Sequence, residues 1–158
     1  MSQVLKNVLY LGKQHMVQIG NYPVISVLDD KLLFPQFLHF RMQKELLAWY
    51  IQQAREVITR QIELNAAQMK ANYTSITFSD TKSRWGACSH ENALQFNWRL
   101  IMAPLLVLNY VVVHELAHTQ EKNHSMHFWH RVSVMNPSYR QQRKWLKQYG
   151  HTLIVPTS

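Results

Sequence analysis

The chain has 158 residues, of which 47% are hydrophobic, and this fits one compact domain with a sizeable core. Its single cysteine, Cys88, excludes the disulfide-rich secreted class, and the lack of both a signal-peptide core and a run of roughly 20 apolar residues leads us to expect a cytoplasmic protein. The net charge is +8, and residues 122–158 lack acidic groups but hold six lysines and arginines, which we interpret as a solvated basic surface that would favour polyanions.

Residues 1–35 are predicted to form two β-hairpins. The segment VLKNVLYLGKQHMVQI, residues 4–19, has two apolar runs separated by Gly12-Lys13-Gln14. The segment PVISVLDDKLLF repeats this pattern with Asp29-Asp30 at its turn.

Residues 36–70 are predicted to form one long amphipathic helix. No glycine or proline occurs from Phe37 to Lys70. Apolar residues recur there at steps of three and four, which predicts one buried stripe: Leu46, Leu47, Tyr50, Ile51, Ala54, Val57, Ile58 and Ile62.

From Tyr73 to Leu100 the pattern again indicates strands. TSITF and SRWGACS are followed by ALQFNWRL, in which apolar and polar residues alternate as in a half-buried strand. Pro104 then begins an apolar helix that we expect to be deeply buried. Val111-Val112-Val113 favours a strand by propensity, but the length of the segment and its histidine spacing favour a helix.

Two further helices are predicted after this one. Ser125 is suited to cap a helix that continues through Val132, and Pro137 precedes a last helix that ends at Gly150.

The apolar helix ends in HELAH, which has the spacing of a metal site. His114 and His118 are four residues apart, so on a helix they lie about 40° apart around the axis and one turn apart along it. Glu115 lies about 100° round from His114, where it can reach a water on the same ion. This is the arrangement of zinc hydrolases, in which the glutamate is the general base that activates a zinc-bound water. Burial of these ionisable side chains favours a site over a chance match.

A catalytic zinc ion needs a third protein ligand, and we expect His124 to supply it. His124 follows His118 after five residues, as in metzincin peptidases, but Glu121 stands where metzincins have a glycine, so Asn123 would have to turn the chain in a left-handed conformation. The alternatives are Glu121 and His127, which lies on the same face of the next helix.

Five blocks of sequence carry a family resemblance: RWGACS (84–89), FNWRLIMAP (96–104), YVVVHELAH (110–118), NHSMHFW (123–129) and a final P-x-Y…W-L (137–146). Together they resemble the YgjP-like metal-dependent hydrolases, which are related to the SprT-like and WLM zinc-peptidase-like domains. The resemblance implies a zincin-like α+β fold, with a small antiparallel sheet packed on the active-site helix. The single domain, residues 1–158, would then comprise the N-terminal β-hairpins, the long helix and a catalytic core over residues 73–150.

The resemblance also implies zinc on His114, His118 and His124, with Glu115 as the catalytic base. Ala87 stands where the family commonly has Ser, and we expect this difference to leave the site unaffected.

The block RWGACS has two interpretations. Gly86 would allow a substrate backbone to approach closely, with Arg84 and Trp85 lining the cleft; alternatively, Trp85 is a core residue and Gly86 marks a bulge. We expect Cys88 to pack in a strand rather than act as a nucleophile. Candidates for stabilising a tetrahedral oxyanion are Tyr139, Arg131 and His127.

Three functions are compatible with the sequence. The first is a zinc metallopeptidase, in which Glu115 activates a zinc-bound water to attack an amide carbonyl of a peptide or protein. The second is a nucleotide pyrophosphatase at the same metal site, although no carboxylate-rich magnesium site is visible. The third is a DNA-associated protease or binding module that uses the basic C-terminal region, which would bind DNA in a strongly salt-dependent way.

Overall fold

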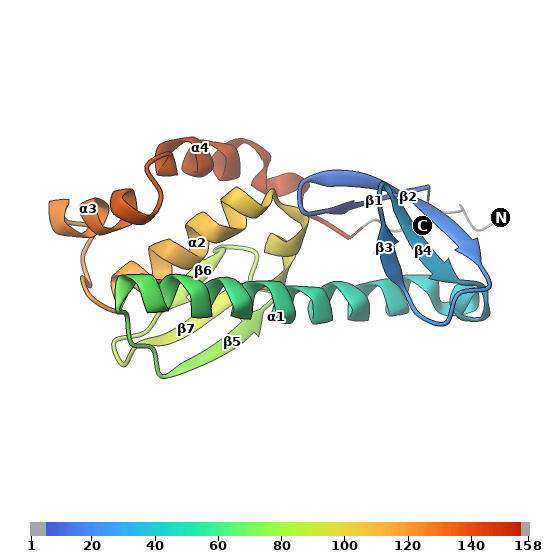
Figure 1. Cartoon of the computed structure of the whole chain (residues 1–158), viewed down its shortest axis with the longest axis horizontal. Helices are drawn as coiled ribbons and strands as arrows, with labels where there is room; N and C mark the ends of the chain where they lie inside the picture. Colours follow the sequence, from blue (N-terminus) through green and yellow to red (C-terminus); the bar gives the residue numbers. More distant parts are fainter. Residues whose placement is uncertain (1–5, 156–158) are drawn as a thin grey trace.

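The structure is a computed structural model that describes residues 6–155 (Figure 1). Val4 and Leu5 of the predicted first strand, and both ends of the predicted 1–158 domain, lie outside the described residues. The described chain has an α+β architecture with two small sheets and four α-helices, as predicted.

The N-terminal strands are β1 (Asn7–Tyr10), β2 (Lys13–Gly20), β3 (Ser26–Leu28) and β4 (Lys31–Pro35). Both predicted hairpins are present, since β1 pairs antiparallel with β2 and β3 with β4. The prediction missed that β2 also pairs with β4 in parallel, which joins the hairpins into one sheet of order β1-β2-β4-β3.

The first turn is tighter than predicted, because Lys13 and Gln14 already belong to β2. Leu11 and Gly12 make the turn with φ angles of 47° and 80°, and two successive positive φ angles are typical of a two-residue hairpin. The same two residues donate backbone hydrogen bonds of 2.8 Å to the carbonyls of Ile101 and Met102. The N-terminal sheet is therefore bonded directly to the segment at residues 101–102.

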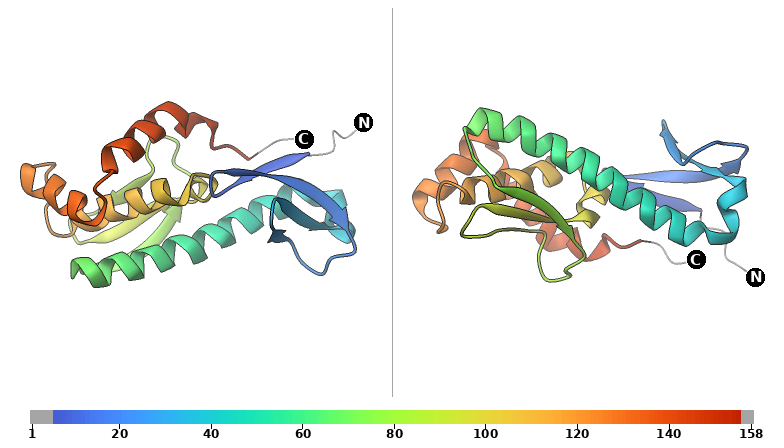
Figure 2. Two further views of the ribbon diagram at one scale, coloured as in Figure 1. Left: turned by 45° about the horizontal axis from the view of Figure 1, so that its top comes forward. Right: turned by 90° about the horizontal axis from the view of Figure 1, so that it is seen from below.

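The predicted long helix begins as a 3-10 helix, η1 (Gln36–Arg41), and continues as α1 (Met42–Met69). Five residues of the predicted stripe are buried, and the stripe extends one turn further: Leu46, Tyr50, Ala54, Ile58, Ile62, Asn65 and Ala66. Leu47 was predicted to be buried but is exposed, and Ile51 and Val57 are partly buried, because the stripe is narrower than predicted. Lys70 ends α1 in a left-handed conformation. Figure 2 shows α1 running from the four-stranded sheet at one end of the molecule to the three-stranded sheet at the other.

The second sheet contains β5 (Ser75–Ser79), β6 (Gly86–Cys88) and β7 (Ala93–Asn97) in the order β5-β7-β6. The predicted antiparallel sheet is wrong in one respect, because β5 pairs with β7 in parallel while β6 and β7 are antiparallel. A short turn joins β6 to β7 and makes that pair antiparallel, whereas the loop after β5 carries the chain across the sheet and leaves β6 as an edge strand.

The alternation in ALQFNWRL ends earlier than predicted. The side chain of Asn97 accepts a hydrogen bond of 2.9 Å from the backbone N–H of Arg99 and opens the 3-10 helix η2 (Trp98–Met102). Trp98 is therefore buried in a helical turn and not in a strand.

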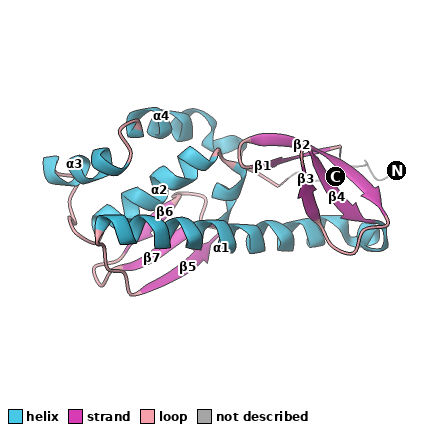
Figure 3. Cartoon of the chain, viewed as in Figure 1, coloured by secondary structure: helices cyan, strands magenta, loops and turns pink. Residues whose placement is uncertain are grey.

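The remaining helices are α2 (Leu105–His118), α3 (Met126–Met135) and α4 (Tyr139–Tyr149), followed by the 3-10 helix η3 (Gly150–Thr152). The valines of α2 adopt the predicted helix because packing outweighs their strand propensity: α2 contacts α1, α3, α4 and β6 and is buried on most sides (Figure 3). Ser125 caps α3 as predicted by accepting a hydrogen bond from the N–H of Phe128. Among residues 6–155, no helix has the length and apolarity of a membrane span.

Candidate metal centre

Three histidine rings meet at the end of α2. His114 and His118 project from the same face of α2, and His124 follows in the loop before α3. The Nε2 atom of His124 lies 3.2 Å from Nε2 of His118 and 3.4 Å from Nε2 of His114. One ring nitrogen from each residue falls within 4.8 Å of the others. The structure thus brings together the three predicted ligands.

These spacings fit a tetrahedral ion. At the usual zinc–nitrogen distance of about 2.0–2.1 Å, two tetrahedral ligands lie roughly 3.3 Å apart. The Nδ1 atom of His118 lies 3.0 Å from the backbone oxygen of Glu121, and only an Nδ1–H can bond to a carbonyl. The Nε2 atom of His118 therefore carries a lone pair that points at the other rings, as a metal ligand requires. Glu121, considered as a third ligand, supplies this backbone oxygen instead.

Tyr110 is a residue that the sequence analysis missed. Its hydroxyl lies 3.2 Å from Nδ1 of His114, and it sits one helical turn before that histidine. The contact orients the ring of His114 so that Nε2 faces the other two histidines. The four-residue spacing on α2 was the available signal.

Burial keeps His114 and His118 neutral. Burial, together with the smaller effects of positive charge on His118, His124 and Arg143, lowers the pKa of His114 to about 3. Burial also lowers the pKa of His118, against the opposing effect of its hydrogen bond to Glu121. Neutral imidazole is the form that binds a metal, so both rings are ready to coordinate near pH 7.

Two aromatic residues of α3 enclose the histidines. The Phe128 ring stacks on His118 with a centroid distance of 4.3 Å, and the Trp129 ring stacks on His124 at 5.9 Å. The sequence suggested that a left-handed conformation at Asn123 turns the chain back toward the site, but Asn123 is not among the described residues with positive φ. The contacts of Phe128 and Trp129 with the histidines take the place of that turn. Packing against α3 therefore holds His124 over α2.

Glu115 is buried beside the histidines, with 5% of its surface exposed. Its Oε1 lies 3.8 Å from Nε2 of His114, and its Oε2 is buried without a hydrogen-bond partner among the described residues. Burial raises the pKa of Glu115 to about 7, although the charge of Arg84 opposes this. An unpaired buried oxygen is costly, and such groups occur where a ligand or water is to be bound. Glu115 is therefore placed to exchange protons near pH 7.

A cavity of about 180 Å³ opens next to this carboxylate. Its walls come from the start of β6 and the residue before it, from α2 and from α4: Trp85, Gly86, Tyr110, Val111, His114, Glu115 and Leu146. This cavity is the space in which a reacting group can approach both Glu115 and His114.

Gly86 lies in β6 against the side chains of Glu115 and Val111. It pairs with Phe96 in a regular ladder, so it does not mark a bulge. A Cβ atom at this position would lie 2.9 Å from Cγ of Glu115 and 3.1 Å from Cγ1 of Val111. Gly86 therefore permits β6 to pass directly against the Glu115 side chain.

Replacing Gly86 by alanine is expected to displace the Glu115 side chain and lower kcat about 10-fold to 100-fold, since a shift near 1 Å of a reacting group costs this much. Steady-state hydrolysis of a peptide by equally metal-loaded proteins measures the effect. Ala87→Ser is the matched control, because successive residues of a strand point to opposite faces. Equal kcat for Gly86→Ala and wild type would show that Glu115 needs no such placement.

The other candidates of the RWGACS block lie as follows. Trp85 lines the cavity beside Glu115. Arg84 is exposed, and its Nη2 donates a hydrogen bond of 3.2 Å to Gln95. Cys88 is half-buried in β6 and packs against the core, and burial raises the pKa of its thiol, as suits a packing residue.

The three predicted oxyanion stabilisers are placed differently. Tyr139 stacks on Trp129 at 5.1 Å and so lies next to the aromatic enclosure of the histidines. Arg131 contacts the carboxylate of Glu121 at 3.5 Å and lines a separate cavity between α1 and α3. His127 is exposed on α3 and is not part of the three-histidine group.

Comparison with known proteins gives two findings. A family model described as "YgjP-like, metallopeptidase domain" matches residues 3–149. No curated protein matches the chain.

Solved structures of similar fold include two metallopeptidase zymogens. Jannalysin of Methanocaldococcus jannaschii aligns with a TM-score of 0.52 and 18% identity, covering 58% of this chain and 94% of its own. Abylysin of Pyrococcus abyssi aligns with a TM-score of 0.51 and 17% identity, covering 57% and 93%. At these identities the similarity concerns the fold, which is the predicted zincin-like one.

Proposed function

The chain belongs to the YgjP-like family of metallopeptidase domains, and from this premise we propose that its metal is zinc, held by His114, His118 and His124, with Glu115 as the general base. As a metallopeptidase domain it is a metal-dependent hydrolase of peptide or protein substrates. The observation that carries the proposal is the convergence of three ring nitrogens within 4.8 Å beside a buried, unpaired carboxylate oxygen. Three nitrogen ligands suit zinc and leave a fourth position for water or substrate.

The residues of this chain divide the reaction between them. When bound, zinc would acidify a water molecule and polarise the substrate carbonyl. Glu115 takes the proton of the attacking water and returns it to the leaving amine, a transfer that a pKa raised to about 7 favours in both directions. Tyr110 holds the orientation of His114, and Trp85 and Leu146 form an apolar part of the wall of the Glu115 cavity.

Strand β6 supports an extended substrate. It is one of the two edge strands of its sheet, and Gly86 brings its backbone against Glu115. A peptide paired with this edge would pass over the carboxylate, with Trp85 and Arg84 beside it. Among the predicted oxyanion stabilisers we favour Tyr139 over Arg131, because Tyr139 packs on Trp129 next to the histidines.

We also propose that residues 1–158 act as one domain, in which residues 73–150 form the catalytic core. The backbone bonds from Leu11 and Gly12 to η2 support this single unit. No observation favours the nucleotide pyrophosphatase or the DNA-associated function: within residues 6–155, the one group of metal-binding type is the three-histidine group.

Removal of the metal tests the proposal. Dialysis against a chelator is expected to abolish hydrolysis of a quenched-fluorescence peptide library, and one equivalent of zinc is expected to restore it, because all three ligands are nitrogen. Magnesium is the control and should not restore activity, because it prefers oxygen ligands. Full activity of protein shown by mass spectrometry to be metal-free would contradict the proposal.

A further inference from the structure

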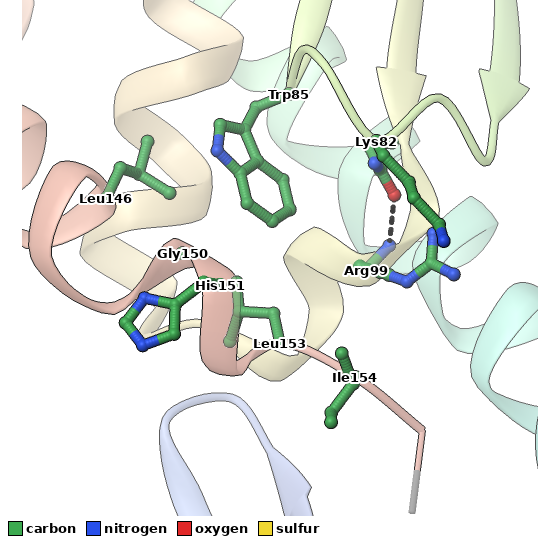
Figure 4. A pocket seen from close by; sticks show the side chains of 9 residues that line it. Lys82, Trp85, Arg99, Leu146, Gly150, His151, Leu153 and Ile154 are labelled. Carbon is green, nitrogen blue, oxygen red and sulfur yellow. Dashed lines mark hydrogen bonds between the residues drawn. The ribbon is translucent and has the colours of Figure 1, made fainter.

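A second cavity, of about 460 Å³, adjoins the Glu115 cavity. Trp85 and Leu146 belong to the walls of both cavities, so the two are neighbours along one face of the molecule. Its volume lies in the range of sites that bind small molecules or single large residues. Figure 4 shows Trp85 between Leu146 and the basic side chains of Lys82 and Arg99 in this view.

The lining of this cavity is cationic at one end and largely apolar elsewhere (Figure 4). Lys82 and Arg99 form the cationic end, the rest of the lining includes Trp85, Leu146, His151, Leu153 and Ile154, and no carboxylate lines the cavity. Lys82 forms no ion pair with any described residue. Arg99 pairs with Asp80 outside the lining, so two cations face one carboxylate and the local balance is positive.

The two cations are positioned by one buried side chain. Asn97 is 3% exposed, and its amide donates a hydrogen bond of 3.0 Å to the carbonyl of Thr81, the residue before Lys82. The Asn97 carbonyl oxygen accepts the backbone N–H of Arg99 at 2.9 Å. The Arg99 guanidinium also lies 4.7 Å above the Trp98 ring. The cationic end is therefore held in place by the fold, since Asn97 fixes the backbone next to Lys82 and the backbone of Arg99.

We propose that this cavity is a specificity subsite that takes a substrate residue bearing a carboxylate. The carboxylate lies at Lys82 and Arg99, and the aliphatic part of the residue contacts Trp85 and Leu146. Charge-assisted hydrogen bonds from lysine and arginine are the interactions that select a carboxylate over an amide of the same shape. This inference rests on the proposed peptidase function. The carboxylate can belong to an acidic side chain or to the C-terminus of the peptide.

Binding of labelled peptides to zinc-loaded Glu115→Gln protein tests the proposal, because this variant binds without hydrolysis. One glutamate is moved along a neutral, C-terminally amidated peptide, and each peptide is compared with its glutamine counterpart by fluorescence anisotropy. A neutral peptide with a free C-terminus forms the second arm. We expect one glutamate position, or the free C-terminus, to bind about 10-fold to 100-fold more tightly than its neutral counterpart.

Charge reversal at Lys82 should remove this preference. Lys82→Glu is expected to bring the acidic and neutral peptides to equal affinity or to favour the neutral one. Lys44→Glu is the matched control, because it changes the net charge equally on an exposed residue of α1 outside the cavity. Equal binding of every acidic and neutral pair, or equal effects of the two variants, would overturn the subsite.

The two proposals can fail separately. If wild-type protein cleaves neutral peptides and no carboxylate improves binding, the subsite is wrong and the peptidase stands. If the carboxylate preference and its loss in Lys82→Glu are seen but no peptide is cleaved, the cavity binds carboxylates and the peptidase proposal is wrong.

Discussion

Replacing Glu115 by glutamine is expected to lower kcat for peptide hydrolysis by about 10³-fold while zinc stays bound. The amide keeps the shape of the side chain beside Gly86 but can no longer accept the proton of the attacking water. General acid–base groups contribute about 10²-fold to 10⁴-fold, and Glu115 serves at two steps. Initial rates, with metal content measured on the same samples, give the result. Hydrolysis at the wild-type rate by the zinc-loaded variant would remove Glu115 from the mechanism.

A stability measurement on metal-free protein provides the control for this variant. The pKa of Glu115 is raised from 4.5 to about 7 by burial, so the folded state holds a proton that the unfolded state has released between these values. The Glu115 contribution to the free energy of unfolding should therefore fall as pH rises from about 4.5 through 7, whereas His114, whose pKa is lowered from 6.5 to about 3, contributes in the opposite direction between those values. Glu115→Gln keeps the histidines, so the difference in free energy of unfolding between the wild type and this variant should fall as pH rises from about 4.5 through 7, and denaturant unfolding at several pH values would detect it.

Replacing His124 by alanine is expected to weaken zinc binding by more than about 100-fold. Loss of a residue that only orients a metal ligand lowers metal affinity by up to about 100-fold, and loss of a direct ligand lowers it more. The stabilisation of the fold by zinc should disappear as well; for a site loaded at 100 times its Kd this amounts to about 2.7 kcal/mol. Competition with a zinc-binding dye and thermal unfolding with and without zinc measure both effects.

His127→Ala is the matched control for His124→Ala. His127 is exposed and lies three residues further on, outside the three-histidine group, so its removal should leave zinc affinity unchanged. If His127→Ala lost zinc and His124→Ala kept it, the third ligand would have to be reassigned.

Local spacing made part of this molecule predictable. His114, Glu115 and His118 share one helix, so their geometry follows from helical periodicity and depends little on the rest of the fold. The helix-capping role of Ser125 and the buried stripe of α1 were predictable for the same reason.

Contacts between distant segments were not predictable in this way. The parallel pairings of β2 with β4 and of β5 with β7 join segments that are distant in the sequence. The local sequence pattern of a strand does not indicate which distant strand it will pair with. The approach of Gly86 to Glu115 also depends on how β6 lies across α2. The sequence alone therefore could not decide whether Gly86 marks a bulge or a close backbone approach.

The contact between the first hairpin and the start of α2 bears on how far the chain can be shortened. A Cβ at Gly12 would lie 2.9 Å from Pro104, and the hairpin caps the carbonyls of Ile101 and Met102. A truncated protein without the hairpin would expose these acceptors and Pro104 at the start of α2. The first hairpin thus supports the start of α2, and a shortened protein would need other groups to bond and cover residues 101–104.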